Sequence, residues 1–204
     1  MTKKLHIAIL AAIAIILTSC AAQPAAPQNQ IAPAALTDGQ RDIINLLSAH
    51  STEIHIFDFH TDGTIQNVEF WLEVYAYGVL IERVQGLSFS EPNPQLFDGQ
   101  LAITIDREND NRDFRWTFTV SQDGWRASNR FDSATLQNDG FAIRHQSLQT
   151  PIEIQNDTEI ILYAAAFFRG NVAIAFSGDL QIFRDQPELL AEYPYVQIIK
   201  ARFF

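Results

Sequence analysis

Cysteine is scarce in this sequence: Cys20 is the only one in 204 residues. A single cysteine excludes an intramolecular disulfide. The chain also lacks G-x-S-x-G, H-E-x-x-H and a glycine-rich phosphate loop, so no common catalytic motif is present. We therefore assign no catalytic residue and no cofactor, and we lean away from an enzyme. A pair of catalytic carboxylates distant in sequence stays open as an alternative.

Long hydrophobic runs are missing as well. The uncharged run over residues 7 to 17 has eleven residues, which at ~1.5 Å per residue cover only about half of a ~30 Å hydrocarbon core. Lys3 and Lys4 precede the run, and Leu17-Thr18-Ser19-Cys20 closes it. This layout is typical of a secretory signal rather than of a transmembrane helix.

The same segment resembles the lipobox of bacterial lipoproteins. The resemblance implies removal of residues 1 to 19, diacylglycerol on the Cys20 sulfur and an acyl chain such as palmitate on its amino group. It places the protein on the extracytoplasmic side of a cell membrane or outer membrane, anchored by lipid. An ordinary signal peptide with a structural cysteine is the alternative, but no second cysteine exists to pair with Cys20.

Three segments follow from this interpretation. Residues 1 to 19 are the signal peptide, and residues 20 to 36 combine the lipidated cysteine with an uncharged tether rich in alanine, proline and glutamine. Residues 37 to 204 are then one domain, rich in phenylalanine and isoleucine and large enough to bury a core.

Basic residues are few. The sequence has 14 Lys and Arg against 24 Asp and Glu, a net charge of −10, and loses Lys3 and Lys4 with the signal. Nucleic acids and anionic headgroups need clustered cations, so both are disfavoured as partners. Five arginines lie on or near one predicted hairpin, but we expect cross-strand pairing there, as between Arg115 and Asp132.

Alternation of apolar and polar residues dominates the rest of the chain. It predicts a mostly β fold, a single antiparallel β-sandwich of immunoglobulin-like or barrel-like form, with near ten strands. Thr37 and Gln40 have capping-box spacing before an amphipathic helix over residues 38 to 49, expected to seal one end of the core. Pro187 opens a one-turn helix near residues 188 to 192. The run over residues 160 to 168 fits a buried strand or a buried helix. Short strands are expected after it, at residues 172 to 176 and 180 to 183.

Three turns organise the predicted hairpins. Asp62-Gly63 is expected to join strands 52 to 60 and 65 to 77, placing Phe57 and Phe59 beside Val68 on the core face. Tyr77-Gly78 offers a second turn, but a tight loop there sets Glu73 opposite Glu82, so its register stays open. Asp123-Gly124 turns a third hairpin, with Trp116 opposite Phe131, Phe118 opposite Asn129, Val120 opposite Ala127 and Thr119 opposite Ser128.

The candidate binding site lies on the other face of the strand over residues 65 to 77, where side chains recur about every 6.6 Å. Rings and carboxylates in this order suit a saccharide platform, and they equally suit a protein-docking surface. The alternative is that Trp71 and Tyr75 pack beneath the helix or the second sheet while the glutamates remain in solvent. The candidate stripe consists of Glu69, Trp71, Glu73, Tyr75 and Tyr77.

No metal site is assigned. Asp58, His60 and Asp62 form a D-x-H-x-D pattern, but acidic residues favour turns for conformational reasons. The loop at Asp106, Glu108 and Asp110 lacks the glycine and the final glutamate of a calcium loop, so we expect a polar hairpin loop. His55 and His60 point to opposite faces of one strand and cannot converge from it.

These features together predict a lipid-anchored, non-catalytic module that binds an envelope glycan or a partner protein. An enzyme acting on envelope polymers is the first alternative. A structural or assembly-accessory lipoprotein without a small ligand is the second.

Overall fold

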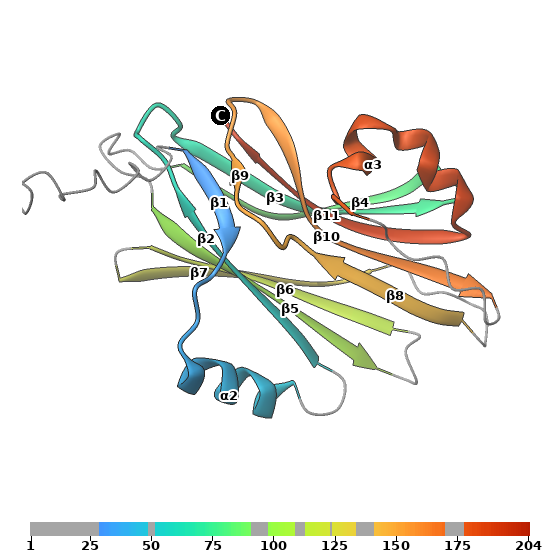
Figure 1. The fold of residues 1–204 in the computed structure, drawn as a ribbon, viewed down its shortest axis with the longest axis horizontal. Helices are drawn as coiled ribbons and strands as arrows, with labels where there is room; N and C mark the ends of the chain where they lie inside the picture. The colour runs from blue at the N-terminus through green and yellow to red at the C-terminus, as the bar shows by residue number, and fades with distance from the viewer. Residues whose placement is uncertain are drawn as a thin grey trace, which may run out of the picture.

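The predicted mostly β, antiparallel sandwich is confirmed. The computed structural model describes two antiparallel sheets packed face to face (Figure 1). The signal peptide and Cys20 lie outside the described part of the chain, as does the strand expected at residues 172 to 176. The described residues are 29–48, 52–90, 98–108, 113–122, 124–133, 141–169 and 178–204.

The first sheet has six strands and the second has five. In spatial order the first contains β7 (Trp125–Asp132), β6 (Asp113–Gln122), β5 (Gly99–Glu108), β2 (Thr52–His60), β1 (Gln30–Pro33) and β9 (Ile152–Glu153). The second contains β4 (Val79–Ser90), β3 (Asn67–Ala76), β11 (Tyr195–Phe203), β10 (Thr158–Arg169) and β8 (Phe141–Ser147).

Three short helices complete the described chain: α2 (Asp38–Leu47), α3 (Ile182–Asp185) and the 3₁₀ helix η1 (Pro187–Glu192). In the described part of the chain none of them has both the length and the apolar character needed to span a bilayer. Pro187 begins η1 as expected. The strand expected at residues 180 to 183 is wrong, because those residues form a turn and the start of α3.

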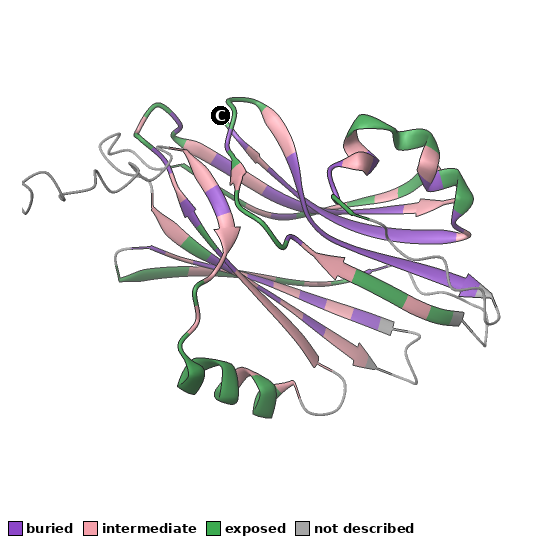
Figure 2. Cartoon of the chain, in the orientation of Figure 1, coloured by how far each residue is buried: buried purple, intermediate pink, exposed green. Residues whose placement is uncertain are grey.

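The main core lies between the sheets and is rich in aromatic rings. Phe57 and Phe59 from β2 face Phe70 and Phe203 from the other sheet, with the Phe59 and Phe203 ring centroids 5.8 Å apart. Because side chains alternate along a strand, each strand buries one row of apolar residues against the opposite sheet. Figure 2 shows the buried positions concentrated on these strands.

A second apolar cluster covers the outer face of the five-stranded sheet. Leu180, Phe183, Leu190 and Tyr193, on and around α3 and η1, pack there on β10 and β11. Strand β10 is therefore buried on both faces, which explains why residues 160 to 168 read as a continuous apolar run. The helical alternative for this run is excluded.

The first predicted hairpin is wrong in its pairing. Strand β2 pairs with β1 and β5, and β3 pairs with β4 and β11, so the chain passes from one sheet to the other between them. Asp62 accepts hydrogen bonds from the backbone N–H and hydroxyl of Thr64, and Gly63 has a φ of 80°. The Asp62-Gly63 dipeptide does turn the chain. The buried residue Ile65 then lies in the segment that connects the two sheets.

A bulge in β4 resolves the open register of the second hairpin. Tyr77 and Gly78 both have positive φ, as a type I′ turn requires, and Ala76 pairs with Val79. The register then shifts between Val74 and Tyr75, which places Glu73 opposite Arg83. The extra residue thus replaces a like-charge pair by an ion pair.

The third hairpin has the predicted register over its described residues. Strands β6 and β7 pair Trp116 with Phe131 and Val120 with Ala127, and Arg115 binds Asp132 at 2.9 Å. Asp123 in its turn lies outside the described residues. The remaining predicted pairs, Phe118 with Asn129 and Thr119 with Ser128, are also present.

The N-terminal helix has the predicted capping box but does not seal the core. Thr37 accepts a hydrogen bond from the Gln40 backbone, while the Gln40 side chain bonds the Thr37 backbone. None of the helix residues is buried, and Figure 2 shows α2 exposed along its length. Its apolar residues Ile43, Leu46 and Leu47 are 59%, 77% and 63% exposed.

The predicted tether extends too far. Residues 30 to 33, assigned to it from composition, form β1 between β2 and β9, and Ile31 is fully buried in the main core. Composition did not predict this strand because it has only four residues and lies within a stretch rich in alanine and proline.

Candidate functional site

The candidate stripe lies on the outer face of β3, but its members differ in burial. Trp71 and Glu73 are 3% and 1% exposed, Glu69 and Tyr75 are partly buried, and Tyr77 is 65% exposed. The alternation along the strand is as predicted. A flat platform of exposed rings is not what the structure contains, and the alternative of solvated glutamates does not hold for Glu73 either.

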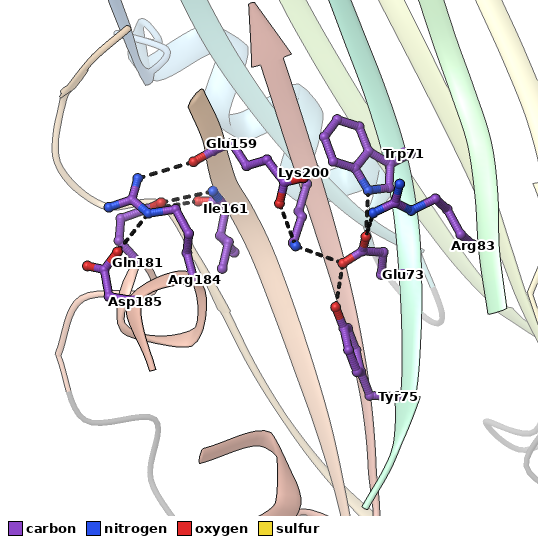
Figure 3. Close-up of polar contacts among 10 residues, drawn as sticks. All are labelled: Trp71, Glu73, Tyr75, Arg83, Glu159, Ile161, Gln181, Arg184, Asp185 and Lys200. Carbon is purple, nitrogen blue, oxygen red and sulfur yellow. Dashed lines mark hydrogen bonds and ion pairs between the residues drawn. The ribbon is translucent and has the colours of Figure 1, made fainter. Parts of the chain in front are cut away.

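Glu73 is the centre of a polar network built from neighbouring strands (Figure 3). Its Oε1 atom accepts a hydrogen bond from Trp71 Nε1 at 3.1 Å and is paired with Arg83 of β4. Its Oε2 atom accepts from Tyr75 Oη at 2.6 Å and pairs with Lys200 Nζ of β11 at 2.8 Å. The Arg83 guanidinium also lies over the Trp71 ring, 5.4 Å from its centroid.

The electrostatics of this network keep Glu73 charged. Burial alone raises the pKa of the carboxyl, but contacts from Lys200, Tyr75 and Arg83 outweigh burial and lower that pKa to about 2. Burial and the same carboxylate raise the pKa of the Tyr75 hydroxyl. Four donors contact the two oxygens of Glu73, and an ionised carboxylate can accept about four hydrogen bonds, so its capacity is filled. The network therefore joins β3, β4 and β11 and leaves Glu73 no acceptor site for a ligand.

Gln181 fastens α3 to the same sheet. Its side chain forms two hydrogen bonds with the backbone of Ile161, donating to the carbonyl at 2.8 Å and accepting from the N–H at 3.0 Å. A hollow of about 270 Å³ lies beside it, where Arg184 pairs with Asp185 at 2.8 Å. Glu153 and Asp179 also line the hollow, so three carboxylates face one guanidinium there.

The exposed end of the β3–β4 hairpin is the accessible part of the stripe. After the Tyr77-Gly78 turn, β4 begins with three consecutive apolar residues, Val79, Leu80 and Ile81, which are 64%, 45% and 51% exposed. Tyr77 N–H bonds the carbonyl of Pro194 at 3.3 Å, so the tip is held against the segment after η1. This apolar tip is therefore presented on a fixed support.

Strand β4 is an edge of the five-stranded sheet, and in the described part of the chain β7 covers its second half. Asn129 of β7 donates a hydrogen bond to the carbonyl of Gly86, and Trp125 packs edge-on against Phe89 with centroids 5.5 Å apart. These contacts close the sandwich near the end of β4. Among the described strands, only β3 forms a β-ladder with residues 79 to 81, and no strand pairs with them at the free edge of the sheet.

The D-x-H-x-D residues do not converge. Asp58 accepts a hydrogen bond from Gln100 at 2.9 Å, His60 pairs with Asp98, and Asp62 holds its own turn through Thr64. Loop residue Asp110 lies outside the described chain, whereas Asp106 and Arg115 pair across the predicted hairpin.

A second polar cluster, unforeseen from the sequence, lies between the two sheets. Glu53 and His55 of β2 face His145 of β8 and Tyr163 of β10. Glu53 also pairs with Arg107 of β5. Glu53 and His55 occupy the inward positions that continue the Phe57 and Phe59 row. That alternation was the available signal, but the sequence does not show that β8 lies opposite.

Burial controls protonation in this cluster. Burial lowers the pKa of His55 to about 4. Burial, together with the nearby charge of Arg107, also lowers the pKa of His145. Both imidazoles are therefore neutral at pH 7, and each keeps one nitrogen lone pair.

Two open antiparallel sheets, capped on one outer face by α3 and η1, define the class of this protein as a β-sandwich. The chain belongs to the YgaN domain family, whose model matches residues 30–202. The match begins at β1, in agreement with the structural start of the domain. A search of curated proteins and a search of solved structures each found no match to the chain.

Proposed function

We propose that this protein is a lipid-anchored, extracytoplasmic module that binds a partner protein along the open first half of β4. The observation that carries the proposal is the run of three exposed apolar residues, Val79, Leu80 and Ile81, on an edge strand. Natural proteins usually cover or charge such an edge, because it offers both apolar surface and unpaired backbone groups. An added strand of the partner would satisfy both.

A protein partner suits the accessible surface better than a glycan does. Trp71, the largest ring of the stripe, is 3% exposed, and the oxygens of Glu73 already accept from four donors. Neither residue is available to stack on a sugar or bind its hydroxyls. The net charge of −10 also disfavours nucleic acid and anionic headgroups.

The edge is tested by photocrosslinking on the full-length protein in cells that produce it. A photoreactive residue replaces Leu80 or, as a control on the covered half of the same strand, exposed Ser88. We expect an adduct of one defined mass from position 80 alone, abolished by the paired substitutions Val79→Lys and Ile81→Lys. An adduct of twice the chain mass would identify a second copy and overturn a heterologous partner. Absence of an adduct, or equal adducts at both positions, would overturn the edge site.

The anchor is tested separately with Cys20→Ser. The resemblance to a lipobox supports acylation at this sulfur, so we expect the variant to lose the lipid mass and leave the membrane fraction. An acylated, membrane-bound species in the variant would contradict lipidation at Cys20. This outcome does not depend on the β4 edge.

A glycan ligand has one specific observation in its favour, the 65% exposure of Tyr77. An exposed ring on a rigid turn can stack against the apolar face of a sugar. This second function would be favoured over protein docking by two results together. They are glycan-array binding that Tyr77→Ala abolishes, and no crosslinked adduct from position 80.

A further inference from the structure

The polar cluster between the sheets brings three metal-binding side chains together. The donor atoms of Glu53, His55 and His145 all lie within 4.8 Å of one another. Glu53 Oε2 is at their centre, 3.5 Å from His55 Nε2 and 3.2 Å from His145 Nδ1. The residues come from both sheets, so this arrangement exists only in the folded sandwich.

These separations are those of ligands around a small ion. Donors at about 2.0–2.1 Å from a tetrahedral Zn²⁺ are about 3.3 Å from each other, which is close to the two distances from Glu53 Oε2 to the histidine nitrogens. His55 Nε2 is buried and has no hydrogen-bond partner among the described residues. A buried, unpaired nitrogen is costly unless something else binds it.

The surrounding residues orient the carboxylate for this role. Arg107 pairs with the Oε1 atom of Glu53, while the two histidines and Tyr163 approach Oε2. Tyr163 Oη donates to Oε2 at 3.1 Å, and the Tyr163 ring lies against both imidazoles, with centroids 4.9 and 6.1 Å away. Such second-layer contacts fix the rotamers of metal ligands.

We infer that Glu53, His55 and His145 form a binding site for one divalent transition-metal ion, with Zn²⁺ the best match to the donor set. Two imidazoles and one carboxylate exclude a preference for Ca²⁺ or Mg²⁺, which favour oxygen ligands. The three protein ligands leave a fourth position, and the His145 side chain, 41% exposed, is on the solvent side. The Arg107 charge opposes a cation, so this site would bind less tightly than a set without it.

The site is tested by calorimetric titration of the full chain with Zn²⁺ alone. We expect one equivalent to bind, and His145→Gln to weaken the affinity by about tenfold or more. His60→Gln is the matched control, because His60 also pairs with a carboxylate, that of Asp98, but lies outside the cluster. Half-exposed His145 is chosen because its replacement spares the core, and circular dichroism checks that each variant folds.

Two further readouts make the result decisive. X-ray absorption on the loaded protein should show two imidazole nitrogens at about 2.0–2.1 Å, and Glu53→Gln should also weaken binding. Unchanged affinity in His145→Gln, equal loss in His60→Gln, or an all-oxygen shell around the ion would each overturn the site.

Discussion

At the scale of single residues, the least expected feature is a buried glutamate with a complete set of partners. Glu73 was predicted to bind a ligand from a solvent-facing stripe, yet Trp71, Tyr75, Arg83 and Lys200 surround it. Removing one partner from such a network leaves a buried charge uncompensated. The free-energy cost of that change exceeds the stability that the intact network adds. The network therefore links the side chains of β3, β4 and β11 and stabilises their packing.

Glu73 makes stability depend on acid pH. Its pKa is about 2 in the folded protein against 4.5 for a free glutamate. Below pH 4.5 the unfolded chain binds a proton that the folded chain does not, so stability present above that pH is lost as the pH falls toward 2. We expect the free energy of unfolding to fall by on the order of 3 kcal/mol from this group. Urea unfolding at several pH values measures it, and Glu73→Gln should flatten the acid limb. An equally steep limb in the variant would contradict this assignment.

Gly86 is a residue where any side chain would collide with the core. It lies in the bulge between the Phe70–Leu87 and Trp71–Gln85 pairs, and an added Cβ would be 2.1 Å from the Phe118 ring. We expect Gly86→Ala to lower the free energy of unfolding by about 3 kcal/mol or more. Gly39 in α2 has open space around its Cα, so Gly39→Ala is the control and should be neutral or slightly stabilising. Equal stability of the two variants in denaturant titration would refute the collision.

At the scale of elements, the sequence predicts faces better than partners. Alternation assigned Phe57, Phe59 and Val68 to the core, and the local β6–β7 hairpin has its predicted register. Alternation could not show that the chain passes to the other sheet at Asp62-Gly63. Two successive strands have the same alternation whether they pair in one hairpin or lie in facing sheets. The other strand partners, such as β11 beside β3, are far apart in the sequence and could not be predicted from local patterns.

The candidate sites illustrate the same limit. The stripe on β3 is visible in the sequence, but Lys200, which neutralises Glu73, comes from the last strand. His55 and His145 likewise converge only because β2 and β8 lie in facing sheets. Spacing along one strand detects side chains on a face, whereas convergence across sheets depends on topology.

The amphipathic helix α2 contributes little to stability despite its capping box. Ile43, Leu46 and Leu47 are all at least 59% exposed, so they bury little apolar surface in this chain. We expect the triple replacement by glutamine to change the free energy of unfolding by less than about 0.5 kcal/mol per residue. Chemical denaturation followed by tryptophan fluorescence measures this. A loss of several kcal/mol would mean that the helix packs on the sandwich after all.

At the scale of the whole molecule, the sandwich is completed by a short strand at its N-terminal end. Strand β1 lies between β2 and β9 and pairs with both, and the Ala34 N–H continues this contact to Ile56 at 2.9 Å. Without β1, the β2 edge would be unpaired and β9 would lose its described neighbour in the sheet. The folded unit therefore starts at about residue 29, before the helix rather than with it.

This boundary can be tested by comparing two shortened chains. A chain beginning at residue 29 keeps β1, whereas one beginning at residue 37 keeps α2 and its Thr37 cap but loses β1. Deleting the fully buried Ile31 alone removes an interaction of about 2–5 kcal/mol, and the lost strand pairing adds to it. We expect the shorter chain to be less stable by at least that amount in urea and the longer one to match the full-length protein. If both chains unfold at the same urea concentration, β1 is dispensable and the domain begins with α2.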